Sequence, residues 1–304
     1  MPANGGMHYK RQNVLGIGVM VLGVALFSCV DVILKLLLAH YPPIQVAGLR
    51  GLVALPILAL WIHGRRAWGS LLRVRPSLQL LRGCLAVGML VLLTVGFRDL
   101  PLANAYTLYF VAPLVMTLLA GPVLGERVSG AHWVGVVGGM LGVVIALRPD
   151  TEGAVDWAGL SVLAAAFCYA GVAVLTRLGS RTDSRESLMF WMAVMMAVVP
   201  CCFAMPGWVV VRTDHLWLLV LLAVTGFLAQ LALTDAFRYG QASVVAPFEY
   251  TALAWGISVD WFIWSVLPTR YTLVGGGVIL ACGLYVLRHE IRSKPLESRG
   301  AGGQ

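Results

Sequence analysis

The stretch VLGIGVMVLGVALFSCVDVILKLLL, residues 14–38, is apolar almost throughout and carries only two charges, Asp31 and Lys35. A helix needs about 20 apolar residues to cross the hydrocarbon core of a bilayer, so this segment is long enough to span a membrane. It is too long for the core of a signal peptide, and no clear small-residue cleavage site follows it. We therefore expect residues 14–38 to form a retained transmembrane helix.

Similar apolar runs continue along the whole chain. Hydrophobic residues make up 59% of the 304 residues, charged residues make up 12%, and the mean hydropathy is +0.84. A soluble domain carries about 25% charged residues, so this chain has too few to cover a water-exposed surface. We expect an all-α integral membrane protein with about ten transmembrane helices and short connections. The expected helices span residues 14–38, 43–63, 78–97, 101–121, 130–148, 157–178, 187–206, 215–236, 243–266 and 270–288.

The basic residues predict the orientation of these helices. If the amino terminus lies in the cytoplasm, fifteen Lys and Arg residues fall on the cytoplasmic side and four on the other side. Such an excess is typical of cytoplasmic loops. We therefore predict a multi-pass protein of the inner (plasma) membrane with both termini in the cytoplasm. The net charge of +8 has the same origin and does not indicate a nucleic-acid partner.

The chain also repeats itself weakly. AFRYG at 236–240 matches GFRDL at 96–100, and FSCVDVILK at 27–35 matches YAGVAVLTR at 169–177. Five helices per copy is an odd number, so the second copy must enter the membrane from the opposite side. Inverted repeats of this kind are typical of secondary transporters. We expect two inverted five-helix repeats, at 13–148 and 157–288, between cytoplasmic tails at 1–12 and 289–304.

Three segments resemble the EamA-type transporters of the drug/metabolite transporter superfamily. They are DVILKLLLAHYPPIQVAGLR at 31–50, LANAYTLYFVAPLVMTLLAGPVLGE at 102–126 and GQASVVAPFEYTALAWG at 240–256. The resemblance covers about residues 13–288. It implies a secondary transporter with two five-helix halves that moves a small organic metabolite, more often outward than inward.

One position departs from the family pattern. The family often ends the fourth helix of each half with Gly-Glu, and the first half here has Gly125-Glu126. The second half has Ser265-Val266 instead. Because the second acid is missing, a symmetric role for the two acids is not expected.

Ionisable side chains inside a membrane cost about 2.5–3.5 kcal/mol each on insertion scales, so they need a partner or a function. Asp31 and Lys35 are four residues apart and share a helix face. They either form a substrate or proton site facing a central cavity, or form an internal ion pair that locks the first helix to its neighbours. Arg50, in the second helix, either binds a substrate carboxylate or pairs with Glu249 or Asp31.

Glu249 follows Pro247, which is expected to kink or open the ninth helix. A carboxylate beside a broken helix is typical of a transport site, so Glu249 is a candidate for proton coupling or cation binding. The alternative is a structural partner for Arg50. Asp260, which lies beside Trp261, is expected at the membrane interface.

Aromatic side chains lie at similar depth in the fourth and ninth helices. They either line a cavity for a flat or amphipathic substrate or pack in the core and against lipid. Arg82 and Asp235, near predicted cytoplasmic helix ends, are expected to snorkel to the interface. Glycines at 135, 138, 139 and 142 are spaced for close helix packing. The aromatic residues are Tyr106, Tyr109 and Phe110 in the fourth helix and Phe248, Tyr250 and Trp255 in the ninth.

The candidate substrate-binding residues are Asp31, Lys35, Arg50, Tyr106, Tyr109, Glu249, Tyr250 and Trp255. The sequence contains no phosphate-binding loop and no metal-ligand spacing, so we expect no cofactor, no metal and no enzymatic activity. We expect export of an amino-acid-like or other carboxylate-bearing solute across the bilayer, with protons as a candidate coupling ion. The alternatives are an uptake permease for a vitamin- or nucleoside-like solute and a non-transporting membrane subunit. The oligomeric state is not indicated.

Overall fold

The computed structural model describes residues 4–72, 74–124, 130–147, 157–179, 182–239 and 246–293, and every regular element in these ranges is a helix. The α-helices are α1 (Asn4–Leu38), α2 (Pro43–Gly64), α3 (Pro76–Asp99), α4 (Leu102–Tyr109), α5 (Ala112–Leu124), α6 (Gly130–Leu147), α7 (Trp157–Gly179), α8 (Arg185–Ala204), α9 (Leu216–Tyr239), α11 (Thr251–Trp264) and α12 (Arg270–Ser293). Short 3₁₀ helices are η1 (Trp68–Leu72), η2 (Met205–Gly207), η3 (Thr213–His215) and η4 (Ala246–Tyr250).

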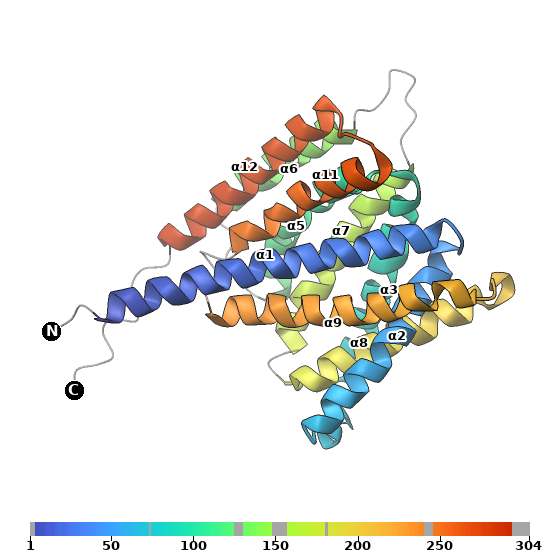
Figure 1. Cartoon of the computed structure of the whole chain (residues 1–304). Coiled ribbons are helices and arrows are strands. Elements are labelled where there is room, and N and C mark those ends of the chain that lie inside the picture. Colours follow the sequence, from blue (N-terminus) through green and yellow to red (C-terminus); the bar gives the residue numbers. More distant parts are fainter. Residues whose placement is uncertain are drawn as a thin grey trace, which may run out of the picture.

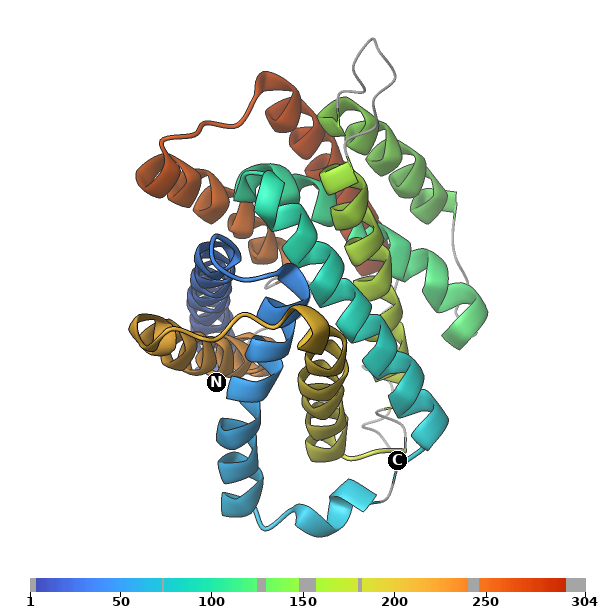
Figure 2. The same ribbon diagram turned by 90° about the vertical axis from the view of Figure 1, so that its right-hand side faces the viewer.

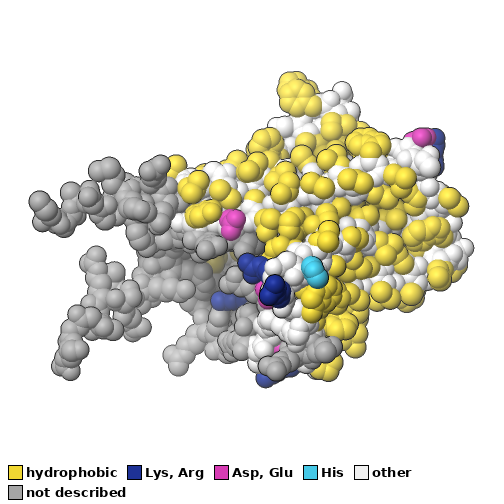
Figure 3. Space-filling model, turned by 60° about the horizontal axis from the view of Figure 1, so that its bottom comes forward, with side chains coloured by type: hydrophobic (Ala, Val, Ile, Leu, Met, Phe, Trp, Pro, Cys, Tyr) yellow, Lys and Arg dark blue, Asp and Glu magenta, His cyan; other side chains and the backbone are white. Residues whose placement is uncertain are grey.

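The described helices have the length and composition of membrane-spanning segments. Six of them are long and apolar enough to cross a bilayer, and shorter apolar helices accompany them. Hydrophobic side chains cover most of the surface drawn in colour in Figure 3, as contact with lipid tails requires. The all-helical membrane fold is thereby confirmed, and the count of ten spans stays a prediction. The six helices are Val14–Leu38, Pro43–Gly64, Pro76–Asp99, Trp157–Gly179, Glu186–Gly207 and Thr213–Leu233.

The first and last helices extend beyond their predicted limits. α1 begins at Asn4, so the polar residues before the first apolar run continue the same helix. α12 likewise continues to Ser293. Figure 1 shows the start of α1 (blue) and the end of α12 (red) at the same end of the molecule.

The most extensive helix contacts join the two halves of the chain. α1 packs along α9, α2 along α8, α3 along α7, and α6 along α12. Figures 1 and 2 accordingly show one interlocked bundle of helices from both halves. Each helix of the first half can be matched to a counterpart in the second half: α1 to α7, α2 to α8, α3 to α9, and α6 to α12. Exchanging the counterparts turns the pair α1–α9 into α7–α3 and leaves α2–α8 and α6–α12 as they are, so the set of pairs is unchanged. Such a pairing is what two related halves that pack into each other would produce.

Glycines allow close approach within these helix pairs. Gly51 of α2 lies directly against the backbone of Met196 and Ala197 of α8, and a Cβ atom at Gly142 of α6 would be 2.7 Å from the side chain of Ile279 in α12. Inside a bilayer, helices gain little from the hydrophobic effect and associate through van der Waals packing. The predicted role of the α6 glycines in close packing is confirmed.

The expected helix over 101–121 is broken. α4 ends at Tyr109 and α5 begins at Ala112, just before Pro113. A proline at this position has no N–H to donate to the Tyr109 carbonyl, and its ring clashes with that carbonyl in a regular helix. The break therefore follows from a residue that the sequence shows, although we expected one continuous helix.

The expected helix over 243–266 contains a second proline, Pro247. Its described part begins with the 3₁₀ turn η4, which contains Pro247 and Glu249, and α11 follows from Thr251. Residues 240–245 lie outside the described residues, so the opening of this helix at Pro247 stays a prediction. Glu249 lies on a 3₁₀ turn instead of a regular α-helical face.

α11 ends at a serine with left-handed backbone geometry. Ser265 has φ 55° and ψ 29°, its N–H donates to the Trp261 carbonyl at 3.1 Å, and the Val266 N–H donates to the Asp260 carbonyl at 3.0 Å. This αL closure favours glycine because a Cβ atom is crowded in the left-handed region. A serine at this position therefore introduces local strain.

Ser265→Gly is expected to raise the free energy of unfolding by about 1 kcal/mol, because it removes the left-handed strain and the exposed serine side chain makes no hydrogen bond to the described residues. Thermal unfolding in detergent measures the change. Ser258→Gly inside α11 is the control and should lower stability. A lower unfolding temperature for Ser265→Gly would contradict the assignment of strain.

Gly51→Ala is expected to destabilise the protein, because its Cβ would meet the α8 backbone. Overpacking of this kind costs about 1–3 kcal/mol. Gly18→Ala in α1 is the matched control, since nothing lies within 4 Å of its Cβ position, and it should be neutral or stabilising. Equal unfolding temperatures for the two variants would show that the α2–α8 contact is not tight.

Candidate functional site

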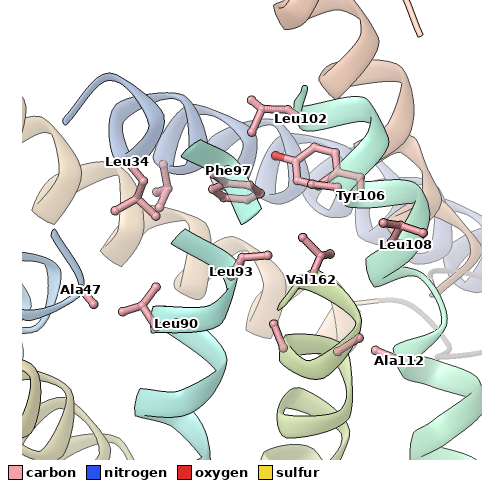
Figure 4. Close-up of a cluster of buried hydrophobic side chains, with 14 of the residues drawn as sticks. Leu34, Ala47, Leu90, Leu93, Phe97, Leu102, Tyr106, Leu108, Ala112 and Val162 are labelled. Carbon is pink, nitrogen blue, oxygen red and sulfur yellow. The ribbon is translucent and has the colours of Figure 1, made fainter. Parts of the chain in front are cut away.

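Asp31 lies at the centre of a polar group formed by α1, α2 and α4. Its Oδ2 atom accepts a hydrogen bond of 2.7 Å from the Tyr106 hydroxyl. Arg50 is close enough to interact electrostatically with the same carboxylate. Figure 4 shows the Tyr106 ring beside Leu102 and Phe97 in the buried core. Three of the predicted site residues are therefore brought together.

The Arg50 guanidinium lies deep in the fold but is not sealed. It makes no hydrogen bond to the described residues, and its nitrogen atoms are not fully covered by protein atoms. Its N–H groups therefore face space that water or a ligand can enter. A cation at membrane depth without a partner costs several kcal/mol, so Arg50 is a candidate for contact with water or a ligand.

Two tyrosines continue the group away from Arg50. Tyr109 of α4 interacts electrostatically with both Asp31 and Arg50. Its ring packs on Tyr169 of α7 with a centroid separation of 5.5 Å and an interplanar angle of 40°. Tyr169 was not predicted as a site residue. It lies in the repeated copy of the segment that contains Asp31, but the residue that it matches in that segment is not ionisable.

Glu249 lies at the far side of the tyrosines. Tyr169 and Tyr250 are its electrostatic neighbours, and its carboxylate makes no hydrogen bond to the described residues. The carboxylate oxygens are also not fully covered by protein atoms. The structure places Arg50 beside Asp31 instead of Glu249, so Glu249 does not serve as the structural partner of Arg50.

Lys35 is directed away from Asp31. Its Nζ atom donates a hydrogen bond of 2.6 Å to the Leu100 carbonyl and lies 4.8 Å from the centre of the Trp264 ring. The ion pair considered for Asp31 and Lys35 is not formed, although the two residues are four apart on one helix. Lys35 instead joins α1 to the α3–α4 connection and to the end of α11.

Asp260 has a different role from the one expected. It is 1% exposed, and its two oxygens accept hydrogen bonds from the backbone N–H groups of Leu102 at 3.0 Å and Ala103 at 2.8 Å. These groups are unpaired donors at the start of α4, where the helix dipole also favours an anion. The predicted interfacial position is wrong, because this cap comes from a residue far away in the sequence.

Arg82 is also buried, at 2% exposure. Its guanidinium donates to Gln79 Oε1 at 2.8 Å, to the Leu188 carbonyl and to Thr176 Oγ1 at 3.4 Å. The prediction that Arg82 snorkels to the interface is wrong, because its terminal nitrogens pair with partners on α3, α7 and α8 inside the bundle.

The remaining predicted site residues lie at the margin of this polar group. Tyr250 packs edge-on against Phe110 with ring centres 5.1 Å apart. Trp255 is 38% exposed on the surface of α11 and does not join the other candidates. The candidate site is therefore built from Asp31, Arg50, Tyr106, Tyr109, Tyr169 and Glu249, and we refer to these six residues as the central site.

One end of the bundle is tied across the two halves of the chain. The Gln45 side chain donates to the Val209 carbonyl at 2.6 Å and accepts from the Val209 N–H at 2.9 Å. The Tyr41 hydroxyl accepts from the Arg212 N–H at 3.0 Å and lies 2.8 Å from His215 Nδ1. These hydrogen bonds join the start of α2 to the connection before α9. We call them the end clamp.

A helical membrane protein with interlocked halves, a helix broken at a proline and a polar site that protein atoms do not fully cover has the architecture of a membrane transporter. A model of the EamA-like transporter family matches residues 14–148 and again residues 156–288. The chain belongs to the EamA-like transporter family.

Several relatives match nearly the whole chain. The S-adenosylmethionine uptake transporter of Rickettsia felis is 30% identical over 281 residues, covering 90% of this chain and 93% of the relative. The pseudopaline exporter CntI of Pseudomonas aeruginosa is 27% identical over 272 residues, covering 88% and 94%. The riboflavin transporter of Vibrio cholerae is 27% identical over 268 residues, covering 85% and 90%. These relatives support a transport function.

A solved crystal structure shares the fold. It has a TM-score of 0.63 at 16% sequence identity and covers 90% of this chain and 98% of the matched chain. The likeness confirms the arrangement of the helices.

Asp260→Ala is expected to lower the free energy of unfolding by about 2 kcal/mol or more, because two buried N–H groups lose their acceptor. Thermal unfolding of the purified protein measures this loss, and Asp260→Asn should lose less. Asp214→Ala removes an exposed pair with Arg212 and should change stability by less than about 1 kcal/mol. Similar effects of Asp260→Ala and Asp214→Ala would refute the capping role.

Proposed function

We propose that the protein is a secondary transporter for a small organic solute with a carboxylate group, which binds to Arg50 in the central site and crosses the inner membrane by alternating access. The observation that carries this proposal is the deep, unsealed guanidinium of Arg50 without a hydrogen bond to the described residues. Arginine is suited to such a role because its planar donors match the two oxygens of a carboxylate.

Asp31 and Tyr106 position this cation. Asp31 attracts the guanidinium, and its Oδ2 atom is held by the Tyr106 hydroxyl. A solute carboxylate would compete with Asp31 for the guanidinium, so Asp31 limits how tightly the solute is held. This exchange suits a site that must bind a solute and then let it go.

The end clamp supplies a barrier that alternating access requires. Its hydrogen bonds join segments from the two halves of the chain, so they must break when the halves separate at that end. The predicted cytoplasmic position of both termini places the end clamp on the opposite side of the membrane. In this proposal the two repeats, 13–148 and 157–288, move against each other around the central site.

Direction is a separate question, because relatives named for uptake and for export cover similar shares of this chain. Export stays the predicted direction. A metabolite comparison of cells and medium, between a deletion strain and the complemented strain, identifies the solute and its direction. An exporter leaves the solute in the cells of the deletion strain, and an importer leaves it in the medium.

Arg50→Ala is expected to reduce the transport efficiency for that solute at least about tenfold, because the lost charge-assisted hydrogen bonds contribute about 1.5–3 kcal/mol. Transport into proteoliposomes measures the effect, and Arg50→Lys should retain part of the activity. Arg65→Ala at the end of the same helix is the matched control, since that side chain is 60% exposed in a surface pair with Glu186. Unchanged transport by Arg50→Ala would rule out Arg50 as the carboxylate-binding residue.

A further inference from the structure

Two of the acids inside the bundle have a basic neighbour. Asp31 lies near Arg50, and Asp260 lies near Lys35 and caps α4. Glu249, by contrast, has no basic side chain as an electrostatic neighbour in the ranges that the structure describes. An acid at membrane depth needs a counter-charge or a proton. Glu249 is therefore the place in the central site where positive charge is missing.

The local fold keeps this carboxylate available to a ligand. Glu249 lies on the 3₁₀ turn η4, two residues after Pro247. It forms no hydrogen bond to the described residues, and its oxygens are not sealed. A structural acid in the same protein looks different, since Asp260 is covered and both of its oxygens are paired. The comparison indicates that Glu249 is oriented toward an exchangeable partner.

The paired tyrosines separate the two ends of the central site. Tyr109 is an electrostatic neighbour of Arg50, and Tyr169 is an electrostatic neighbour of Glu249. The two rings pack on each other at 5.5 Å. A cation-binding end and an anion-binding end are therefore connected by an aromatic surface. Aromatic faces also attract cations, which favours a positive group on the Glu249 side.

We propose that the central site selects dipolar solutes, whose carboxylate binds Arg50 while a separate cationic group, such as a guanidinium, ammonium or sulfonium, binds Glu249 across the tyrosine pair. This inference rests on the proposed function and extends it from carboxylates in general to this class. A neutral solute of the same shape leaves Glu249 without its counter-charge and binds more weakly.

Matched solute pairs that differ by one positive charge test the inference. Arginine and citrulline differ at the guanidinium, and S-adenosylmethionine and S-adenosylhomocysteine differ at the sulfonium. Proteoliposomes with the full-length protein are loaded with each labelled probe in turn, and transport efficiencies are compared. The wild-type protein should favour the charged member of a transported pair at least about tenfold, which corresponds to one charge-assisted contact.

Glu249→Gln should abolish this preference, because it should reduce transport of the charged member at least about tenfold more than transport of the neutral member. Glu249→Asp keeps the charge and should keep most of the preference. Glu186→Gln is the matched control, because that acid pairs with Arg65 at the protein surface and should leave the preference unchanged. Arg50→Ala should reduce transport of both members of a pair.

Three results would overturn the inference. The first is a wild-type protein that transports both members of a pair equally. The second is a Glu249→Gln variant that keeps the preference but loses its response to a proton gradient, which would make Glu249 a proton carrier only. The third is a lack of transport of all four probes. The proposed function would survive each of these results if Arg50 is still needed for the solute found by metabolite comparison, so the two failures can be told apart.

Discussion

The structure depends on the rule that backbone groups inside a bilayer must find partners within the protein. Regular helices satisfy this rule on their own, but the first turn of α4 does not. Asp260 of α11 supplies the two missing acceptors for Leu102 and Ala103. This contact joins the two halves of the chain and fixes the position of α4, the helix that carries Tyr106 and Tyr109.

The same rule explains why the site lies where helices are broken. Pro113 removes a backbone donor, so the helix cannot continue regularly from α4 into α5, and Pro247 lies in the 3₁₀ turn that precedes α11. Non-helical backbone at membrane depth is tolerated where it is buried in protein or lines a polar cavity. The unsealed side chains of Arg50 and Glu249 provide evidence for such polar space. The irregular helices and the polar site therefore require each other.

The sequence was sufficient for the class of fold and for most single site residues. Hydropathy predicted the helices because each apolar run is a local signal, and membrane cost marked Asp31, Arg50 and Glu249 as unusual. Long-range partners could not be predicted. The i, i+4 spacing suggested an ion pair between Asp31 and Lys35, but Tyr106 and the Leu100 carbonyl come from other helices and compete successfully. Tyr169 was missed for the same reason, since its importance comes only from its contact with Tyr109.

Burial explains the two corrections at Arg82 and Asp260. Both were placed at the interface because a charge near a helix end can reach water. Each lies instead beside backbone groups, Arg82 next to the Leu188 carbonyl of α8 and Asp260 next to the unpaired amides at the start of α4. A charged side chain that pairs with the backbone resolves two costs at once, its own desolvation and that of the backbone group. Glu249 lacks any such partner among the described residues, and this difference from Asp260 is the basis for proposing a ligand there.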